Sequence, residues 1–160
     1  MPPIKFLYKT EKKAIMQKLE YYGITKLPYL LIESGKEKIR GYTGSLLMEE
    51  IHELNKQIGI DLIGLYLFHN YSDNLRLSFD AIYALKDQIT KNIIEVNDEQ
   101  AIEFLKGRDI NLIEKDKERF KEQGETFGFK IIKYKDEFLG TCKLTEDRII
   151  NYMPKERRLR

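Results

Sequence analysis

Basic side chains and a tyrosine gather at the C-terminal end of the sequence. The last thirteen residues contain five basic side chains and one acidic side chain, so they carry a formal charge of +4, whereas the whole chain of 160 residues carries only +2. Lysine and arginine can hold phosphates, and a tyrosine ring gives a surface on which a base can stack. The pattern predicts contact with nucleic acid, and a solvated, frayed tail is the alternative. The predicted contacts are Arg148, Tyr152, Lys155, Arg157 and Arg158.

A second basic group flanks a glycine at the end of a predicted helix. Gly107 follows the helical segment, with Lys106 before it and Arg108 after it. A glycine in this position can adopt the left-handed conformation and leave its amide open to a phosphate. We therefore add these three residues to the predicted RNA-binding site, although an ordinary helix C-cap is the simpler explanation of the glycine taken alone.

A glycine also interrupts the strand-like run of residues 138–144. Glycine inside a strand marks a bulge, a barrel corner or the close approach of a ligand, and we favour the barrel corner for Gly140. Lys143 adds a cation near the end of this run and joins the predicted site. Cys142 has no histidine in the same local motif, so we expect no catalytic thiolate there.

The motifs that hold nucleotide cofactors or catalytic metals are missing from the sequence. It contains no Gly-x-Gly-x-x-Gly after a strand, no Gly-x-x-x-x-Gly-Lys-Ser/Thr and no His-Glu-x-x-His. One cysteine with two histidines, His52 and His69, cannot form a four-ligand zinc site from Cys and His alone. We therefore expect no cofactor, no metal and no catalytic activity. An autonomous enzyme, with a pocket gathered from distant positions, is the least favoured hypothesis.

The elements that position these residues follow from hydrophobic periodicity and from capping residues. The first part of the chain predicts a small α/β region, in which Thr10 and Ser45 cap the two helices and Gly23 and Gly59 end them. Its expected strands cover residues 4–8, 29–32, 38–42 and 62–69, and its first helix covers residues 11–22.

A junction follows at residues 70–92. Its turn-rich start leads to a short strand at residues 75–77, and Ser78 is placed to cap a short helix through Leu85. We place a domain boundary near residues 87–92 and divide the chain into a domain of unknown role at 1–88 and a second domain at 89–160.

The second domain is expected to be a mostly β barrel with one helix beside it. Asn97 and Gln100 have the spacing of a capping box for a helix over residues 98–106, after a strand at 92–96. We interpret the highly charged residues 111–124 as a mobile insertion, with a solvated helix as the alternative. Three closely spaced strands at residues 127–134, 138–144 and 148–152 suit a small barrel or meander.

The order of four segments resembles the PUA-like domain, named after pseudouridine synthases and archaeosine transglycosylases. The version that it is most similar to is the C-terminal RNA-binding module of Sun-family RNA cytosine-5 methyltransferases. In that family a strand leads into a helix that ends in a Leu-basic-Gly turn, then a strand with a Leu-Gly pair follows, then a basic strand that closes in Asn-Tyr-x-Pro-Lys. The matching segments are Ile94-Glu95-Val96, Gln100-Ala101-Ile102-Glu103-Phe104-Leu105-Lys106-Gly107, Phe138-Leu139-Gly140 and Arg148-Ile149-Ile150-Asn151-Tyr152-Met153-Pro154-Lys155.

The resemblance implies an α+β protein in which a small α/β region is followed by a PUA-like β-barrel that binds structured RNA, either tRNA or rRNA. It also implies that the turn around Gly107 and the basic C-terminal end lie together in one groove. Methyl transfer is not carried over, because no S-adenosylmethionine loop is visible. We expect a non-catalytic, cytoplasmic adaptor or assembly factor in RNA modification or ribosome biogenesis, without membrane contact. The alternative is an RNA-targeting subunit of a separate RNA-modifying enzyme such as a methyltransferase, which should leave an apolar docking face exposed on the N-terminal half.

Overall fold

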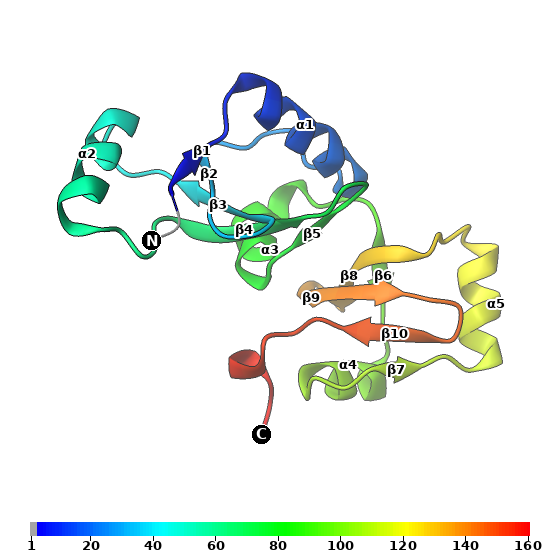
Figure 1. The fold of residues 1–160 in the computed structure, drawn as a ribbon. Coiled ribbons are helices and arrows are strands. Elements are labelled where there is room, and N and C mark those ends of the chain that lie inside the picture. The colour runs from blue at the N-terminus through cyan, green and yellow to red at the C-terminus, as the bar shows by residue number, and fades with distance from the viewer. Residues whose placement is uncertain (1–2) are drawn as a thin grey trace. The chain divides into compact units, whose positions relative to one another are not determined.

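The computed structural model describes residues 3–160, which form two compact units, Met1–Ile89 and Thr90–Arg160. Each unit contains a five-stranded sheet. Figure 1 shows the strands of each unit accompanied by short helices. The expected α+β class is therefore confirmed. No helix in this part of the chain combines the length and the hydrophobicity that crossing a bilayer requires.

The first unit contains an antiparallel sheet whose strands are ordered along the sheet as they are along the chain. The strands are β1 (Lys5–Phe6), β2 (Leu30–Glu33), β3 (Lys38–Tyr42), β4 (Leu65–Asn70) and β5 (Leu75–Leu77). Apolar side chains from alternate strand positions fill its core, including Leu31, Leu67 and Leu77. Tyr22 lies fully buried among them, and its hydroxyl donates a hydrogen bond to the Leu75 carbonyl at 2.6 Å.

Three helices accompany this sheet: α1 (Lys9–Leu19), α2 (Met48–Ile58) and α3 (Phe79–Leu85). Short 3-10 turns follow α1 and α3, at Glu20–Tyr22 and Lys86–Gln88. The predicted cap of α3 is confirmed, because Ser78 Oγ accepts a hydrogen bond from the Ala81 amide at 3.0 Å. Gly23, at φ 87°, ends the first helical segment, and Gly59 ends α2, as expected.

The predicted caps of the first two helices are wrong. α1 begins after Tyr8 and α2 after Leu47, so Thr10 is inside its helix and Ser45 lies before its helix. In both cases a glutamate in the first turn accepts a hydrogen bond from the backbone amide just before the helix. Glu11 reaches the Tyr8 amide at 3.1 Å and Glu50 reaches the Leu47 amide at 2.6 Å. In a capping box the glutamate accepts from the backbone amide of the N-cap residue itself. A serine or threonine at the N-cap bonds a different amide, that of the third helical residue.

The second unit contains a sheet ordered β6-β8-β9-β10-β7, which curls into a half-barrel. The edge strands β6 and β7 do not pair with each other, so this sheet stays open. The pair β6–β8 is parallel and the other pairs are antiparallel. The strands are β6 (Ile93–Glu95), β7 (Ile110–Asn111), β8 (Gly128–Tyr134), β9 (Glu137–Leu144) and β10 (Arg148–Asn151).

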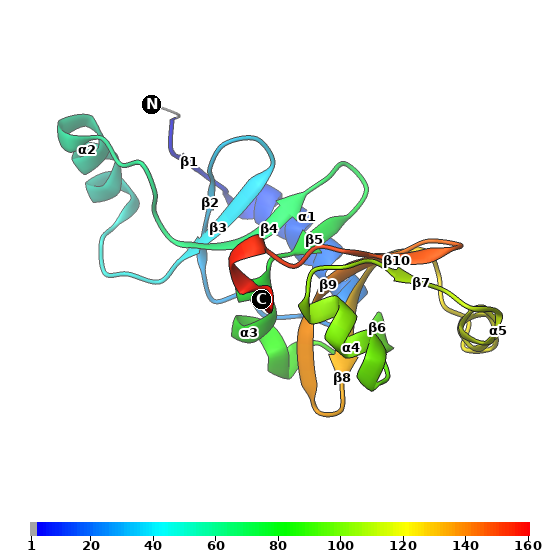
Figure 2. The same ribbon diagram turned by 90° about the horizontal axis from the view of Figure 1, so that it is seen from below.

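Two helices, not one, accompany this sheet. The helix α4 (Asp98–Leu105) has the predicted capping box, in which the Gln100 amide donates to Asn97 Oδ1 at 2.9 Å and Gln100 Oε1 accepts from the Asn97 amide at 3.2 Å. The charged segment forms a second helix, α5 (Glu114–Glu122), so the preferred interpretation as a mobile insertion is wrong. Phe120 is the buried residue of α5, and this single anchor on a charged helix explains the weak apolar signal. Figure 2 shows α5 end-on beside the strands of this unit.

Candidate nucleic-acid interface

Strand β10 has one buried face and one face that carries predicted site residues. Ile149 lies opposite Leu144 of β9, and both are about 1% exposed, so this face belongs to the core. On the other face Ile150 lies opposite Lys143. Because side chains alternate along a strand, Arg148 and Tyr152 share the face of Ile150 and Lys143. The alternation in the sequence had left open which of these two faces is buried.

The ring of Phe129 links two of the residues on this face. Lys143 Nζ lies 5.7 Å from the centre of the Phe129 ring, within the range of a cation–π contact. The Tyr152 ring meets the same ring edge-on, with the centres 5.6 Å apart. Tyr152 is therefore held by packing against its neighbour rather than left on a mobile tail, and its ring orientation is fixed before any ligand arrives.

The end of β10 is fastened to the end of α4 by one side chain, Asn151. Its amide nitrogen donates to the carbonyls of Phe104 at 2.8 Å and Arg108 at 3.0 Å, while its Oδ1 accepts from the Met153 amide at 2.7 Å. The last carbonyls of a helix lack partners within that helix, so the Asn151 side chain satisfies one of them. These bonds bring the Gly107 turn and the C-terminal segment together.

Gly107 is required at this turn for two reasons. Its φ of 81° lies in the left-handed region, which costs a residue with a Cβ. In addition, the side chain of Arg158 crosses directly over it, so that a Cβ at position 107 would overlap the Arg158 Cδ and Nε atoms. Arg158 Nε donates to the Met153 carbonyl at 3.1 Å, which holds the guanidinium in this place. The turn and the C-terminal segment are thus in contact, as the resemblance implied.

The C-terminal segment is ordered rather than frayed. A 3-10 turn forms at Lys155–Arg157, and the Leu159 amide donates to the Leu105 carbonyl of α4 at 2.8 Å. Met153, just before this turn, is 2% exposed and anchors the segment in the core. The solvated, frayed tail that the composition allowed is therefore wrong as a description of this segment.

Acidic side chains partly neutralise the positive charge of this surface. Arg108 pairs with Glu103 at 3.1 Å and Arg148 pairs with Asp109 at 3.5 Å, and all four side chains are well exposed. Exposed ion pairs contribute about 0–1 kcal/mol, so a phosphate can compete for either arginine. Lys106 and Lys155 are exposed and make no ion pair with any of residues 3–160.

The predicted residues thus fall into two groups that one aspartate connects. The first group lies on the sheet face (Lys143, Arg148 and Tyr152), and the second is the turn-and-tail group (Lys106, Gly107, Arg108, Lys155, Arg157 and Arg158). Asp109 Oδ2 contacts Arg148, while its Oδ1 accepts from the Asn151 amide at 2.8 Å. No local pattern indicates the roles of Asp109 and Asn151, because their partners lie about 40 residues away along the chain.

Cys142 lies in the core, opposite Asn151 on β10. Its thiol is fully buried, and this burial raises its pKa far above the ordinary value for cysteine. A thiol must lose its proton to act as a nucleophile, so Cys142 is inert in the folded protein. Within residues 3–160, moreover, no three His, Cys, Asp or Glu side chains come together in a way that could hold a metal ion.

Comparison with known proteins agrees with this geometry. Residues 91–159 match the family model described as the methyltransferase RsmF PUA domain. The ribosomal RNA small subunit methyltransferase F of Shewanella piezotolerans is 30% identical over 148 residues, which are 92% of this chain and 29% of that protein. The protein of the same name from Shewanella woodyi is 38% identical over 94 residues, which are 59% of this chain and 18% of that protein.

The chain spans less than a third of the length of these curated relatives. The family model covers the second unit, whereas the Shewanella piezotolerans match extends over most of the first unit as well. The sheet, the Gly107 turn and the ordered C-terminal segment all fall inside the matched residues 91–159. Residues 91–159 therefore form a PUA-like module that resembles the C-terminal domain of the Sun-family RNA methyltransferases.

Proposed function

We propose that this chain is a non-catalytic RNA-binding protein that serves the methylation of ribosomal RNA. The observation that carries the proposal is the contact between the Gly107 turn and the ordered basic segment, which places cations from both on one edge of a PUA-like module. Cations that lie together can contact successive phosphates, which gives affinity without a base code. Ribosomal RNA is favoured over tRNA because the relatives are named as ribosomal RNA methyltransferases.

Two observations support a role in binding rather than in catalysis. The sequence lacks the recognised cofactor motifs, and Cys142 is buried with a raised pKa. The surface offers lysine and arginine side chains, which bind phosphate through charge-assisted hydrogen bonds. In this proposal the methyl transfer belongs to a methyltransferase domain, and the chain delivers the RNA.

Crosslinking of the protein to RNA in cells, followed by sequencing of the bound RNA, tests this proposal. We expect enrichment of small-subunit ribosomal RNA over tRNA and messenger RNA. In vitro, affinity for the enriched RNA should fall steeply as salt rises, because each neutralised phosphate releases condensed counterions. An absence of any RNA enrichment would overturn the function and leave the fold unaffected.

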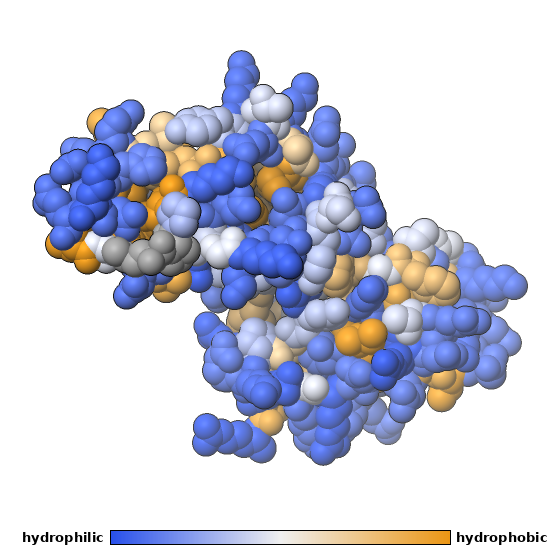
Figure 3. Space-filling view, viewed as in Figure 1, coloured by the Kyte–Doolittle hydropathy of each residue, from blue (hydrophilic) through white to orange (hydrophobic). Residues whose placement is uncertain are grey.

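The first unit has an exposed apolar face that favours a docking role. The apolar stripe of α2 consists of Ile51, Leu54 and Ile58, with Leu47 just before the helix, and only Ile51 is fully covered, against Phe6 and Ile32. Leu47 is 64% exposed and Ile58 is 71% exposed. Leu62 and Leu65 are also exposed, and Figure 3 shows hydrophobic residues at the surface around α2. In this proposal the face is the docking surface of an RNA-targeting partner of a methyltransferase.

Replacing Leu47 and Ile58 by serine is expected to weaken binding to a methyltransferase domain about 10-fold or more. Burial of one such side chain is worth roughly 1.5–3 kcal/mol, and both are exposed in the unbound protein. The partner is the part of the Shewanella piezotolerans relative outside the matched residues, and titration calorimetry measures the affinity. The matched control is Glu53→Ser on the polar side of α2, which should bind as the wild type does. Equal affinity of all three proteins would contradict the docking role.

A further inference from the structure

A hollow lies between α5 and the turn that joins β9 to β10, outside the residues assigned above to RNA binding. Its volume is about 300 Å³, at the lower end of the range of about 300–1,000 Å³ for small-ligand sites. Apolar side chains line much of it, together with the charged side chains of two lysines and two glutamates. The lining includes Leu112, Phe120, Phe127 and Leu144, with Lys121 and Glu146 at the rim.

Phe127 is the unusual member of this lining, because it is 68% exposed. Its neighbours in the hollow, Phe120 and Leu144, are 7% and 1% exposed, so they already belong to the core. A phenylalanine side chain that remains exposed beside an apolar hollow is accessible to a flat partner. Offset stacking on such a ring is favourable for any aromatic ligand.

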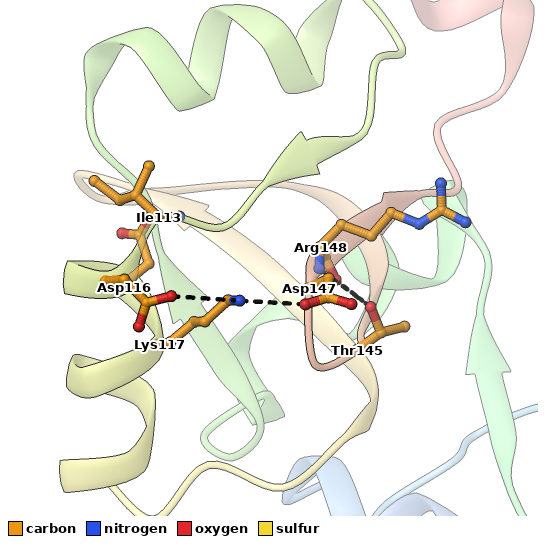
Figure 4. A network of polar contacts seen from close by, with 7 residues as sticks. Ile113, Asp116, Lys117, Thr145, Asp147 and Arg148 are labelled. Carbon is orange, nitrogen blue, oxygen red and sulfur yellow. Dashed lines mark hydrogen bonds and ion pairs between the residues drawn. The ribbon is translucent and has the colours of Figure 1, made fainter.

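The walls of the hollow are held in place by polar contacts. Lys117 of α5 reaches across to Asp147 in the β9–β10 turn at 3.2 Å, as Figure 4 shows. This hydrogen bond with Asp147 raises the pKa of Lys117, so its ammonium group keeps its charge at neutral pH. Within the turn, the Thr145 hydroxyl donates to the Arg148 carbonyl at 2.8 Å and accepts from the Arg148 amide at 3.2 Å. The Lys117–Asp147 pair therefore joins the helix to the turn, and the two Thr145–Arg148 bonds hold the turn itself.

Two charged groups at the rim remain available for a ligand. Glu125 forms an ion pair with the buried ammonium group of Lys130 at 3.1 Å, and Lys117 forms one with Asp147. Lys121 and Glu146, by contrast, form no ion pair within residues 3–160. One cation and one carboxylate suit a ligand that is anionic at one end and carries a hydrogen-bond donor at the other.

We propose that this hollow binds a single unpaired nucleobase of the RNA, one that carries an exocyclic amino group. The proposal rests on the RNA-binding function proposed above. The base would stack on Phe127, its amino group would donate to Glu146, and Lys121 would contact the phosphate of the same nucleotide. The hollow is too small for a duplex, and its balanced rim charge does not suit a continuous phosphate backbone.

The position of the hollow along β10 supports this assignment. Arg148 begins β10 directly after the turn at the hollow, and Asn151 ends it at the Gly107 turn. Three residue steps at roughly 3.4 Å each separate the two ends by about 10 Å. A bound RNA strand that contacts the turn-and-tail group can therefore place a neighbouring unpaired nucleotide in the hollow, with Arg148 between them.

Two RNA probes and two variants of the full chain make the first test of the proposal. The probes are a hairpin with an unpaired loop of adenines and a blunt duplex of the same stem. Loss of one base stack costs roughly 1–3 kcal/mol, so Phe127→Ala should weaken binding to the hairpin between about 5-fold and 150-fold and leave binding to the duplex unchanged. Phe127→Leu, which keeps the apolar bulk but not the ring, should behave as Phe127→Ala does. Because Phe127 is exposed, circular dichroism should show both proteins folded.

The variant Phe127→Trp gives a readout that does not depend on affinity. The sequence contains no tryptophan, so the introduced indole is the only one and its fluorescence reports the hollow alone. We expect the hairpin with adenines to quench this fluorescence, and the duplex to leave it unchanged. A loop of uridines, which lack the amino group, should bind more weakly than the adenine loop, and Glu146→Gln should reduce that difference.

The failure of this proposal can be separated from the failure of the RNA-binding function. If the wild type binds neither probe, the function and the base site both fail. If it binds both probes, while Phe127→Ala binds like the wild type and the indole is not quenched, the base site alone is overturned. Quenching by the adenine hairpin, together with a loss of affinity confined to that hairpin, supports the proposal.

Discussion

Reversing the charge of Arg157 or Arg108 is expected to weaken binding to structured RNA about 30-fold in each case. Two unit charges 4 Å apart in water interact with about 1 kcal/mol, so replacing attraction by repulsion changes the binding free energy by about 2 kcal/mol. Both side chains are exposed, which limits the effect on folding to roughly 0.5 kcal/mol. Filter binding at a fixed salt concentration measures the loss for Arg157→Glu and Arg108→Glu.

The two reversals should act alike because the turn and the C-terminal segment are in contact. Arg108 belongs to the turn, Arg157 belongs to the segment, and Arg158 from the segment covers Gly107 in the turn. The control is Lys36→Glu, an exposed lysine in a turn of the first unit, which changes the net charge by the same amount. If both reversals bind RNA as tightly as this control does, the basic surface plays no part in binding and the proposed function is wrong.

The sequence predicted those elements whose signals are local. Three helix ends were predicted from signals within a few residues of each end, and all three are confirmed. They are the caps formed by Asn97 with Gln100 and by Ser78, and the end at Gly23. Strands β8, β9 and β10 of the second unit were predicted because their apolar positions alternate between closely spaced turns, whereas the two-residue strand β7 was not predicted. The helix α5 was only the alternative to a mobile insertion, because a single buried residue, Phe120, gives no periodic apolar pattern.

The residue types of the candidate site could be predicted from the sequence, but the contacts between these residues could not. Charge clustering pointed to the turn and to the C-terminal segment, and the resemblance placed them together. Nothing local indicates that Arg158 folds back over Gly107, or that Asp109 binds both Arg148 and the Asn151 amide. The hollow beside Phe127 depends on residues from α5, β9 and the loops between them, so no stretch of sequence contains it.

Replacement of Asn151 by alanine is expected to destabilise the second unit by about 3 kcal/mol and to weaken RNA binding at the same time. The side chain makes three hydrogen bonds, two to the carbonyls of Phe104 and Arg108 and one from the Met153 amide. A buried polar group that loses its partner costs about 1–3 kcal/mol, and the half-buried position of Asn151 lets water recover part of the loss. Urea denaturation followed by circular dichroism measures the change.

Asn151→Ala should also weaken RNA binding, because the side chain of Asn151 links the Gly107 turn to β10. Without it the carbonyls of Phe104 and Arg108 lose their bonds to β10, although the Leu159–Leu105 hydrogen bond and the Arg158 contact remain. The cations of the turn and of the C-terminal segment then lose part of their common orientation. Asn111→Ala is the matched control, since Asn111 lies on the neighbouring strand opposite Arg148 with an exposed side chain. It should change stability by less than roughly 0.5 kcal/mol and leave RNA affinity intact. If Asn151→Ala were as stable as this control, the three bonds would not hold the surface together. If it were destabilised but bound RNA normally below its unfolding transition, the orientation of the turn would not matter for binding.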